Sequence, residues 1–236
     1  MEPVLALLPS PLLPASAWQP VAQRLAASGW TVARVGVSEI LANPLGTTGE
    51  VRARFLDAIP ADREVILIPH SNAGLYVPGL TTERRVRGYV FVDAGLPPAA
   101  GPIRVAPKQF YDFLKHKADQ DGLLPPWTQW WDEDISVLFP SREVQEQVER
   151  GQPRLPLSYF AATLAVPSGW DRLPGAYLGF GQTYAAERAA AAVRGWPTAV
   201  LEGRHLHLLV DPDRVAAQLQ ALLGQAGLAR RETRTP

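Results

Sequence analysis

The sequence contains no cysteine and no excess of charge of either sign. Lys+Arg and Asp+Glu number 23 each among the 236 residues, so the formal net charge is zero. Without cysteine, disulfides and thiolate metal sites are excluded. A neutral chain also lacks the general attraction to phosphate on which nucleic-acid binding depends. No two of the four histidines stand four residues apart on a predicted helix, so we expect neither a metal site nor a cofactor.

Long apolar runs are also missing, and no stretch reaches the length needed to span a bilayer. The first residues, MEPVLALLPS, have no basic segment, and their apolar run is short and broken by prolines, unlike a secretory signal. We therefore expect a cytoplasmic protein without membrane association, ending in a flexible polar tail over residues 229–236. The sequence gives no indication of oligomeric state.

The sequence has enough apolar residues, 47%, for one sizeable core. Short apolar runs that suit buried strands alternate with helical patterns, which predicts an α/β fold with a mostly parallel sheet of about six strands flanked by helices. The expected strands cover residues 4–8, 31–35, 65–68, 90–92, 176–180 and 199–201. The expected helices cover residues 20–28, 50–58, 74–80, 185–193 and 212–223.

Residues 97–172 interrupt this alternation and are predicted to form a helical lid inserted into a core of residues 1–96 and 173–228. Helical patterns cover residues 107–118 and 143–150. The segment also holds four of the seven tryptophans: Trp127, Trp130, Trp131 and Trp170. Aromatic side chains both pack and bind ligands, so these residues either fill the core of the lid or line a substrate pocket. We take Trp127, Trp130 and Trp131 as candidate substrate-binding residues.

A serine stands where the apolar run 65–68 ends, in the sequence VILIPHSNAG over residues 65–74. A buried strand, a sharp turn carrying Ser71, and a helix form the pattern of a nucleophile elbow. The usual Gly-x-Ser-x-Gly is altered, because Pro69 and Ala73 replace the two glycines, although Gly74 follows. The simpler interpretation of Ser71 is a helix N-cap.

With this elbow the chain resembles the α/β-hydrolase superfamily, in particular the plant esterase and hydroxynitrile-lyase-like branch and its bacterial relatives. Two further segments carry the resemblance: WQPV at residues 18–21 and GRHLHLLVDPDRVA at residues 203–216. The resemblance implies that Ser71 is the nucleophile and that His205 is its general base. His207 competes for the second role, and the Gly-x-His pattern favours His205.

The third member of such a triad is harder to place. The superfamily usually carries an acid after the penultimate strand, but here that segment, LGFGQTYAAE, offers only Glu187 within a predicted helix. Asp93 ends the preceding predicted strand, and some members, such as certain dehalogenases, take their acid from that position. We assign Asp93 to orient His205, with a Ser–His dyad and a capping role for Asp93 as the alternatives.

The resemblance also implies an oxyanion hole. One donor would be the backbone N–H of Asn72, the residue after the nucleophile. The second normally lies after the first strand, where this chain reads Pro9-Ser10-Pro11. Proline has no N–H, so the Leu12 N–H or the Ser10 hydroxyl would have to donate.

Together these residues predict a serine-dependent enzyme that transfers an acyl group through an acyl-enzyme, either to water or to another acceptor. The aromatic segment favours a small aromatic or apolar acyl group, and a carrier-protein-bound donor stays open. Few lysines beside many Ala, Arg and Pro residues are typical of high-GC bacteria, which would suit specialised metabolism. One alternative is a hydroxynitrile-lyase-like lyase, which would need a lysine, and all three lysines (Lys108, Lys115 and Lys117) fall in the predicted lid. Another is a non-catalytic ligand binder on a hydrolase scaffold.

Overall fold

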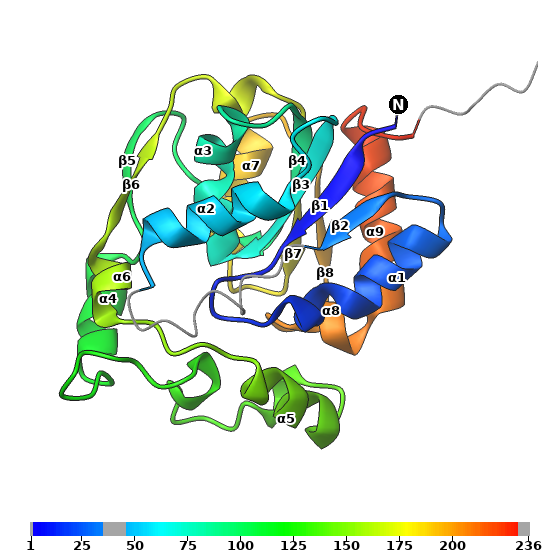
Figure 1. The fold of residues 1–236 in the computed structure, drawn as a ribbon. Coiled ribbons are helices and arrows are strands. Elements are labelled where there is room, and N and C mark those ends of the chain that lie inside the picture. Colours follow the sequence, from blue (N-terminus) through cyan, green and yellow to red (C-terminus); the bar gives the residue numbers. More distant parts are fainter. Residues whose placement is uncertain (1, 35–45, 231–236) are drawn as a thin grey trace, which may run out of the picture.

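A six-stranded parallel sheet forms the centre of the computed structural model, which describes residues 2–34 and 46–230 (Figure 1). Its strands are β1 (Val4–Leu8), β2 (Val32–Arg34), β3 (Val65–Ser71), β4 (Val86–Ala94), β7 (Gly175–Phe180) and β8 (Thr198–Leu201). The order across the sheet is β2-β1-β3-β4-β7-β8, and every neighbouring pair is parallel. The predicted α/β fold with about six parallel strands is therefore confirmed. The end of the second predicted strand, Val35, and tail residues 231–236 lie outside the described residues.

Helices cover both faces of the sheet, which is why the central strands are apolar on both faces. All residues of β1, β3 and β7 are buried. Figure 1 shows α1 (Gln19–Ala27) and α9 (Pro212–Gln225) on one face of the sheet. On the other face lie α2 (Thr48–Ala58), α3 (Val77–Thr81) and α7 (Ala185–Val193).

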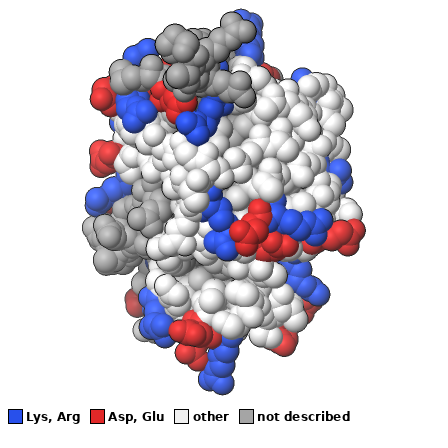
Figure 2. Space-filling view, turned by 90° about the vertical axis from the view of Figure 1, so that its right-hand side faces the viewer, with Lys and Arg blue, Asp and Glu red and all other residues white. Residues whose placement is uncertain are grey.

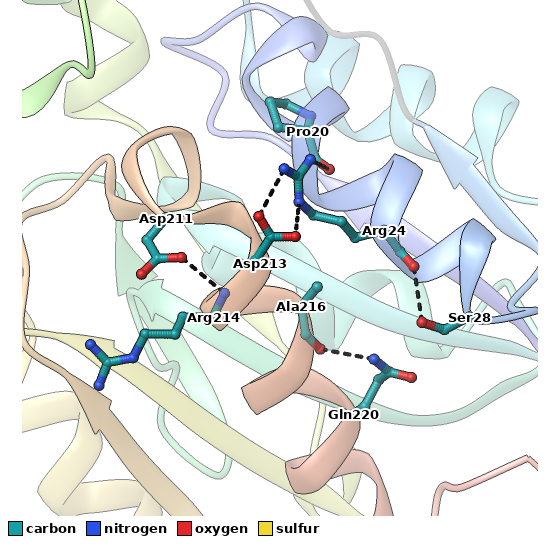
Figure 3. A network of polar contacts seen from close by, with 8 residues as sticks. All are labelled: Pro20, Arg24, Ser28, Asp211, Asp213, Arg214, Ala216 and Gln220. Carbon is teal, nitrogen blue, oxygen red and sulfur yellow. Dashed lines mark hydrogen bonds and ion pairs between the residues drawn. The ribbon is translucent and has the colours of Figure 1, made fainter.

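Polar side chains fix the ends and the packing of these helices. Thr47 and Glu50 form a reciprocal capping box at the start of α2. Asp211 accepts a hydrogen bond from the Arg214 N–H, as an N-cap of α9 should (Figure 3). Arg24 of α1 meets Asp213 of α9 with two hydrogen bonds, of 2.6 and 3.0 Å, which fastens the two helices on that face together.

The segment between β4 and β7, called the inserted segment below (residues 95–174), leaves the sheet and returns to it. It contains α4 (Lys108–Lys115), α5 (Arg142–Arg150), α6 (Leu157–Ala161) and the antiparallel pair β5 (Gly101–Arg104) and β6 (Thr163–Val166). Short 3-10 turns complete it: η4 (Trp127–Gln129), η5 (Ser136–Leu138) and η6 (Trp170–Arg172). Figure 1 shows this segment along one side of the sheet and beyond the carboxyl ends of the strands. The sequence indicated the helices at α4 and α5 but not the antiparallel pair.

Charged side chains on the face seen in Figure 2 are interspersed, with blue and red groups adjoining and large uncharged areas between them. Such a face provides no single-sign field for a polyanionic partner. Among residues 2–34 and 46–230, no helix combines the length and apolar character that crossing a bilayer requires. Within the same residues, no cluster of three or more His, Asp or Glu side chains is arranged to hold a metal ion.

Candidate active site

The turn from β3 into the 3-10 helix η3 (Asn72–Tyr76) holds Ser71 in a strained conformation. Its φ is 58° and its ψ is −129°, a combination that residues with a Cβ rarely adopt. The turn is tight because η3 packs closely on the end of β4. A Cβ on Gly74 would lie 2.1 Å from the Gly95 carbonyl oxygen, so only glycine fits there. Gly74 thus provides the close approach at this elbow, and Ala73 can stand where the usual pattern has glycine.

Ser71 lies at the point where the chain reverses its direction across the sheet. After β1 the chain proceeds to β2 on one side, whereas β3 and all later strands lie on the other. The connections that follow β1 and β3 lead to opposite sides there, and ligands of open α/β sheets bind in the crevices that such reversals form. Leu12, from the loop after β1, lines the same cavity as Ser71.

Asp93 and His205 are joined by a short hydrogen bond beside Ser71. His205 Nδ1 lies 2.7 Å from Asp93 Oδ2, and the second carboxylate oxygen accepts a hydrogen bond of 2.9 Å from the Phe180 N–H. Asp93 is fully buried, while His205 keeps 13% of its side chain exposed and lines the cavity with Ser71. Ser71 Oγ and His205 Nε2 share no hydrogen bond in this structure.

The backbone at Asp93 is strained in the same way as that at Ser71. Among the described residues these two alone combine a side chain with a positive φ, which is 41° at Asp93. The strand pairing places Ser71 opposite Ala94, so the two strained positions are neighbours at one edge of the sheet. The Tyr177 hydroxyl holds the turn by accepting from the Ala94 N–H at 2.9 Å and donating to the Ala94 carbonyl at 2.6 Å. Paired strain of this kind is typical of functional sites.

His70 packs against the ring of His205, a contact that the sequence did not indicate. The two rings stack with their centroids 4.6 Å apart, and His70 Nε2 lies 3.0 Å from the His205 carbonyl oxygen. Because a carbonyl only accepts, Nε2 carries the proton. Trp18 packs edge-on against the other side of the His70 ring, at 6.1 Å. Burial, and next the nearby His205, hold the pKa of His70 well below its usual range, so this ring is neutral.

Replacing His70 with glutamine should flatten the acid side of the stability curve. Native His70 resists a proton that the unfolded chain accepts near pH 6.5, so stability falls as pH drops below that value. The slope for one such group is about 1.4 kcal/mol per pH unit. Glutamine can donate to the His205 carbonyl without titrating. Urea unfolding from pH 7 to 5 should show a smaller slope for His70→Gln, and no change for exposed His116→Gln; equal slopes in both variants would contradict this reading.

His207 lies away from the cavity. Its ring contacts Gly203, where a Cβ would come within 2.5 Å of the imidazole, and it packs edge-on against Phe180 at 5.5 Å. Burial lowers the pKa of His207. Of the two histidines in this loop, the structure brings only His205 to Asp93 and to the cavity.

A cavity of about 480 Å³ opens above Ser71 and His205. Trp127, Trp130 and Trp131 all line it, although they differ in exposure: 8%, 0% and 38% respectively. Trp130 also packs on Phe160 within the inserted segment, so this residue both fills the core of the segment and lines the cavity. The fourth tryptophan of the segment, Trp170, stacks in the core of the sheet instead. The cavity wall is thus mostly apolar and rich in aromatic side chains, with charged groups at Glu133, Asp134 and Arg204.

The two residues expected to form an oxyanion hole are both at the cavity. Asn72 follows Ser71 at the start of η3, and its side chain is held by the Tyr159 hydroxyl at 2.7 Å and by the Val105 carbonyl at 3.5 Å. Leu12 lines the cavity, but its N–H donates to Ser10 Oγ at 3.3 Å. The Ser10 hydroxyl is therefore the acceptor for Leu12, and it is buried beneath the loop.

A second cavity, of about 440 Å³, adjoins the first. The two share Asn72, Tyr184, Pro107 and Phe110 as lining residues. The walls of the second are mostly apolar, with Glu187 and Arg104 as its charged members. The turn that carries Ser71 and Asn72 therefore lies next to two separate spaces.

Comparisons with known proteins identify the fold that carries this site. No protein-family model and no curated protein matches the sequence. Among solved structures, an extracellular α/β-hydrolase from a Paenibacillus species, described as homologous to tobacco salicylic acid binding protein 2, superposes with a TM-score of 0.71 at 17% identity, over 95% of this chain and 98% of that one. Polyneuridine aldehyde esterase (a histidine-to-alanine mutant) gives a TM-score of 0.69 at 16% identity, over 95% and 99%. A methylesterase from Arabidopsis gives 0.68 at 13%, over 94% and 99%.

Proposed function

We propose that this chain, which has the α/β-hydrolase fold, is a serine-dependent acyl-transfer enzyme with Ser71 as nucleophile, His205 as general base and Asp93 as the acid that orients it. The observation that carries the proposal is the 2.7 Å hydrogen bond between His205 Nδ1 and the buried Asp93 carboxylate, beside a strained serine in one cavity. A binding protein has no physical need for these three groups together.

The proposed reaction has two halves. When a substrate carbonyl enters the cavity, Ser71 Oγ attacks the carbonyl carbon and its proton passes to His205 Nε2. Asp93 holds Nδ1–H and stabilises the imidazolium that forms, and His205 then protonates the leaving group. In the second half, His205 takes a proton from the acceptor, which attacks the acyl carbon. As the bond between that carbon and Ser71 Oγ breaks, His205 gives the proton to Oγ and the free enzyme is restored.

The oxyanion of the tetrahedral intermediate would be bound by two backbone N–H groups, those of Asn72 and Leu12. The Asn72 N–H lies in the first turn of η3, and the Tyr159 hydroxyl holds the Asn72 side chain in place by donating a hydrogen bond to it. Leu12 N–H makes only a long bond of 3.3 Å to Ser10 Oγ, which a charged oxygen would outcompete. Pro11 can make no such contribution.

The aromatic cavity favours a small aromatic or apolar acyl group. Trp127 packs against His205 with centroids 6.0 Å apart, so an acyl group bound at Ser71 would share its cavity with this indole. Trp130 and Trp131 extend the apolar wall, and the inserted segment that carries them would act as a lid over the bound acyl group. The second cavity offers space for the leaving or accepting group, across Asn72 and Tyr184.

Water is the acceptor that we favour, which makes the enzyme an esterase. Two of the structures that it resembles are described as an esterase and a methylesterase. A thioester or carrier-protein-bound donor, and transfer to another hydroxyl, thiol or amine, stay within the same chemistry. The lyase alternative is weaker, because no lysine lines either cavity; Lys108 and Lys117 instead pair with Asp112 and Asp132 on the surface.

The experiment is to offer a panel of aromatic and aliphatic esters and thioesters, with and without alcohol, thiol or amine acceptors. An esterase should release free acid at a rate that the acceptors leave unchanged. Acid release that falls as an acylated acceptor accumulates would identify a transferase. If no donor in the panel is turned over while a ligand binds equally well to wild type and Ser71→Ala, the binder alternative replaces the proposal.

A further inference from the structure

The carboxamide of Asn72 ends a chain of hydrogen bonds that begins at two buried tyrosines. The Tyr76 hydroxyl lies 2.8 Å from the Tyr159 hydroxyl, which lies 2.7 Å from Asn72 Oδ1. Asn72 Nδ2 lies 3.5 Å from the Val105 carbonyl oxygen, a long hydrogen bond. Both tyrosines belong to the core, whereas Asn72 is half-buried and lines both cavities. The chain therefore leads from the core to the boundary between the two spaces beside Ser71.

The proton positions in this chain follow from its fixed acceptor. A backbone carbonyl only accepts, so the Asn72 atom that faces Val105 is the NH₂ nitrogen, and Oδ1 faces Tyr159. An amide oxygen also only accepts, so Tyr159 donates to it and in turn accepts from Tyr76. Burial is the main cause that raises the pKa of both phenols, so each keeps the proton that this arrangement requires. With its oxygen occupied, the Asn72 side chain can offer a ligand only a hydrogen-bond donor.

One side-chain N–H of Asn72 is left without a partner. The NH₂ group has two hydrogens, and the Val105 carbonyl accepts from one of them. Among residues 2–34 and 46–230, Nδ2 makes no other hydrogen bond. Tyr159 and Val105 both belong to the inserted segment, so this segment fixes the plane of the amide at the turn after β3. A donor held in one orientation beside two mostly apolar cavities is suited to fixing the orientation of a substrate.

We propose that the Asn72 side chain determines specificity by donating a hydrogen bond to a neutral oxygen of the substrate, within a few bonds of the carbonyl that is attacked. The inference rests on the proposed function. The acyl carbon would be bonded to Ser71 Oγ, and Asn72 is the next residue, so an oxygen within reach of its amide lies close to that carbon. A hydroxyl, ether or keto oxygen on the acyl group or on the alcohol part has the required chemistry. A carboxylate would need more donors or a cation to compensate its desolvation.

This role is separate from that of the oxyanion hole. The backbone N–H of Asn72 would bind the carbonyl oxygen, whereas its side chain would bind a second oxygen that takes part in no bond change. Tyr159 is a positioning residue, because it acts only by holding the Asn72 oxygen. Loss of either group should therefore change the preference between substrates with and without the second oxygen. A contact that only joins the inserted segment to the turn would affect both kinds of substrate equally.

The test uses two pairs of esters in which an ether oxygen replaces a CH₂ group. On the alcohol side, 2-methoxyethyl phenylacetate is compared with butyl phenylacetate. On the acyl side, methyl 2-methoxy-2-phenylacetate is compared with methyl 2-phenylbutanoate. The ratio of kcat/KM within each pair is measured for wild type and variants, so that differences in intrinsic reactivity cancel between proteins.

We expect Asn72→Leu to lower the ratio of the oxygenated ester to its partner by about three- to tenfold for one pair, because one hydrogen bond is lost. The pair affected identifies the side of the substrate that carries the oxygen. Tyr159→Phe, which frees the amide to rotate, should lower the same ratio by less. Tyr111→Phe removes a phenol of α4 that lines neither cavity, so it should keep the wild-type ratio.

Ratios that Asn72→Leu leaves unchanged in both pairs would overturn the inference. If that variant does not fold, Tyr159→Phe decides, and unchanged ratios there contradict it. If wild type is labelled by a fluorophosphonate but cleaves none of the esters, the pairs are compared as competitors of labelling. Equal or absent protection by the two members of each pair then overturns the inference. Failure of wild type to label overturns the proposed function itself.

Discussion

Replacing His205 with glutamine is expected to lower kcat/KM for any ester that the protein hydrolyses by about 10⁵-fold. His205 is the one imidazole that lies at the cavity with Ser71 and bonds to a buried carboxylate. Without it, Ser71 has no base to take its proton, and only the binding and oxyanion contributions remain. Steady-state hydrolysis, with active protein counted from folded fraction, would measure the loss.

His207→Gln is the matched control for this variant. It changes the neighbouring histidine of the same loop, whose ring packs on Gly203 and Phe180 away from the cavity. We expect it to reduce stability and to leave kcat/KM within about tenfold of wild type, since no reacting atom contacts it. Comparable losses in both variants would mean that the loop, not the His205 imidazole, is what catalysis requires.

Asp93→Asn should lower kcat by about 10⁴-fold while the variant remains folded. The carboxylate accepts from His205 Nδ1–H and from the Phe180 N–H, and it fixes which ring nitrogen faces Ser71. In the variant, the side-chain NH₂ of the new asparagine would face His205 Nδ1 and donate a hydrogen bond to it. Nδ1 would then carry the lone pair and Nε2 the proton, so Nε2 could not accept a proton from Ser71. Substrate binding does not involve this buried group, so KM should change little.

Glu187→Gln provides the comparison, because Glu187 is the carboxylate that sequence position alone would offer as the acid. It lies in the first turn of α7 and lines the second cavity, with no hydrogen bond to His205. We expect a change smaller than about tenfold. A larger loss for Glu187→Gln than for Asp93→Asn would transfer the role to Glu187 and remove the basis for the proposed triad.

The parts of the site that the sequence indicated are those fixed by position along a strand. Ser71 is the last residue of β3 and Asp93 the last but one of β4, and the carboxyl ends of neighbouring parallel strands meet, so their closeness follows from the pattern. His205 follows the last strand, β8, in a loop of the expected type. For the same reason the six strands and their covering helices could be predicted from the alternation of apolar runs.

The parts that the sequence did not indicate depend on how side chains meet across distant segments. In the sequence His70 is simply the residue before Ser71, and only the fold shows that its ring stacks on that of His205. In the sequence Tyr184 is an ordinary loop aromatic, and only the fold places its ring over His205 and in the cavity that Ser71 lines. The antiparallel pair of β5 and β6 is short and mostly exposed, so it leaves no apolar alternation to detect.

The Trp residues illustrate an ambiguity that composition cannot resolve. Trp130 and Trp170 are both buried in or beside the inserted segment, yet one lines the cavity and the other stacks against the sheet. The two tryptophans are equally apolar, so the sequence does not distinguish them. Their different surroundings depend on how the inserted segment folds back on the sheet, which long-range contacts determine.

Whether Ser71 is a nucleophile activated by its neighbours can be measured as the intact mass of the protein after treatment with a fluorophosphonate. Such a reagent forms a stable bond only with a serine whose base is in place. We expect one adduct on wild type, mapped to the peptide that contains Ser71, and none on folded Ser71→Ala. A folded wild-type protein that stays unlabelled, or an adduct that persists in Ser71→Ala, would contradict it.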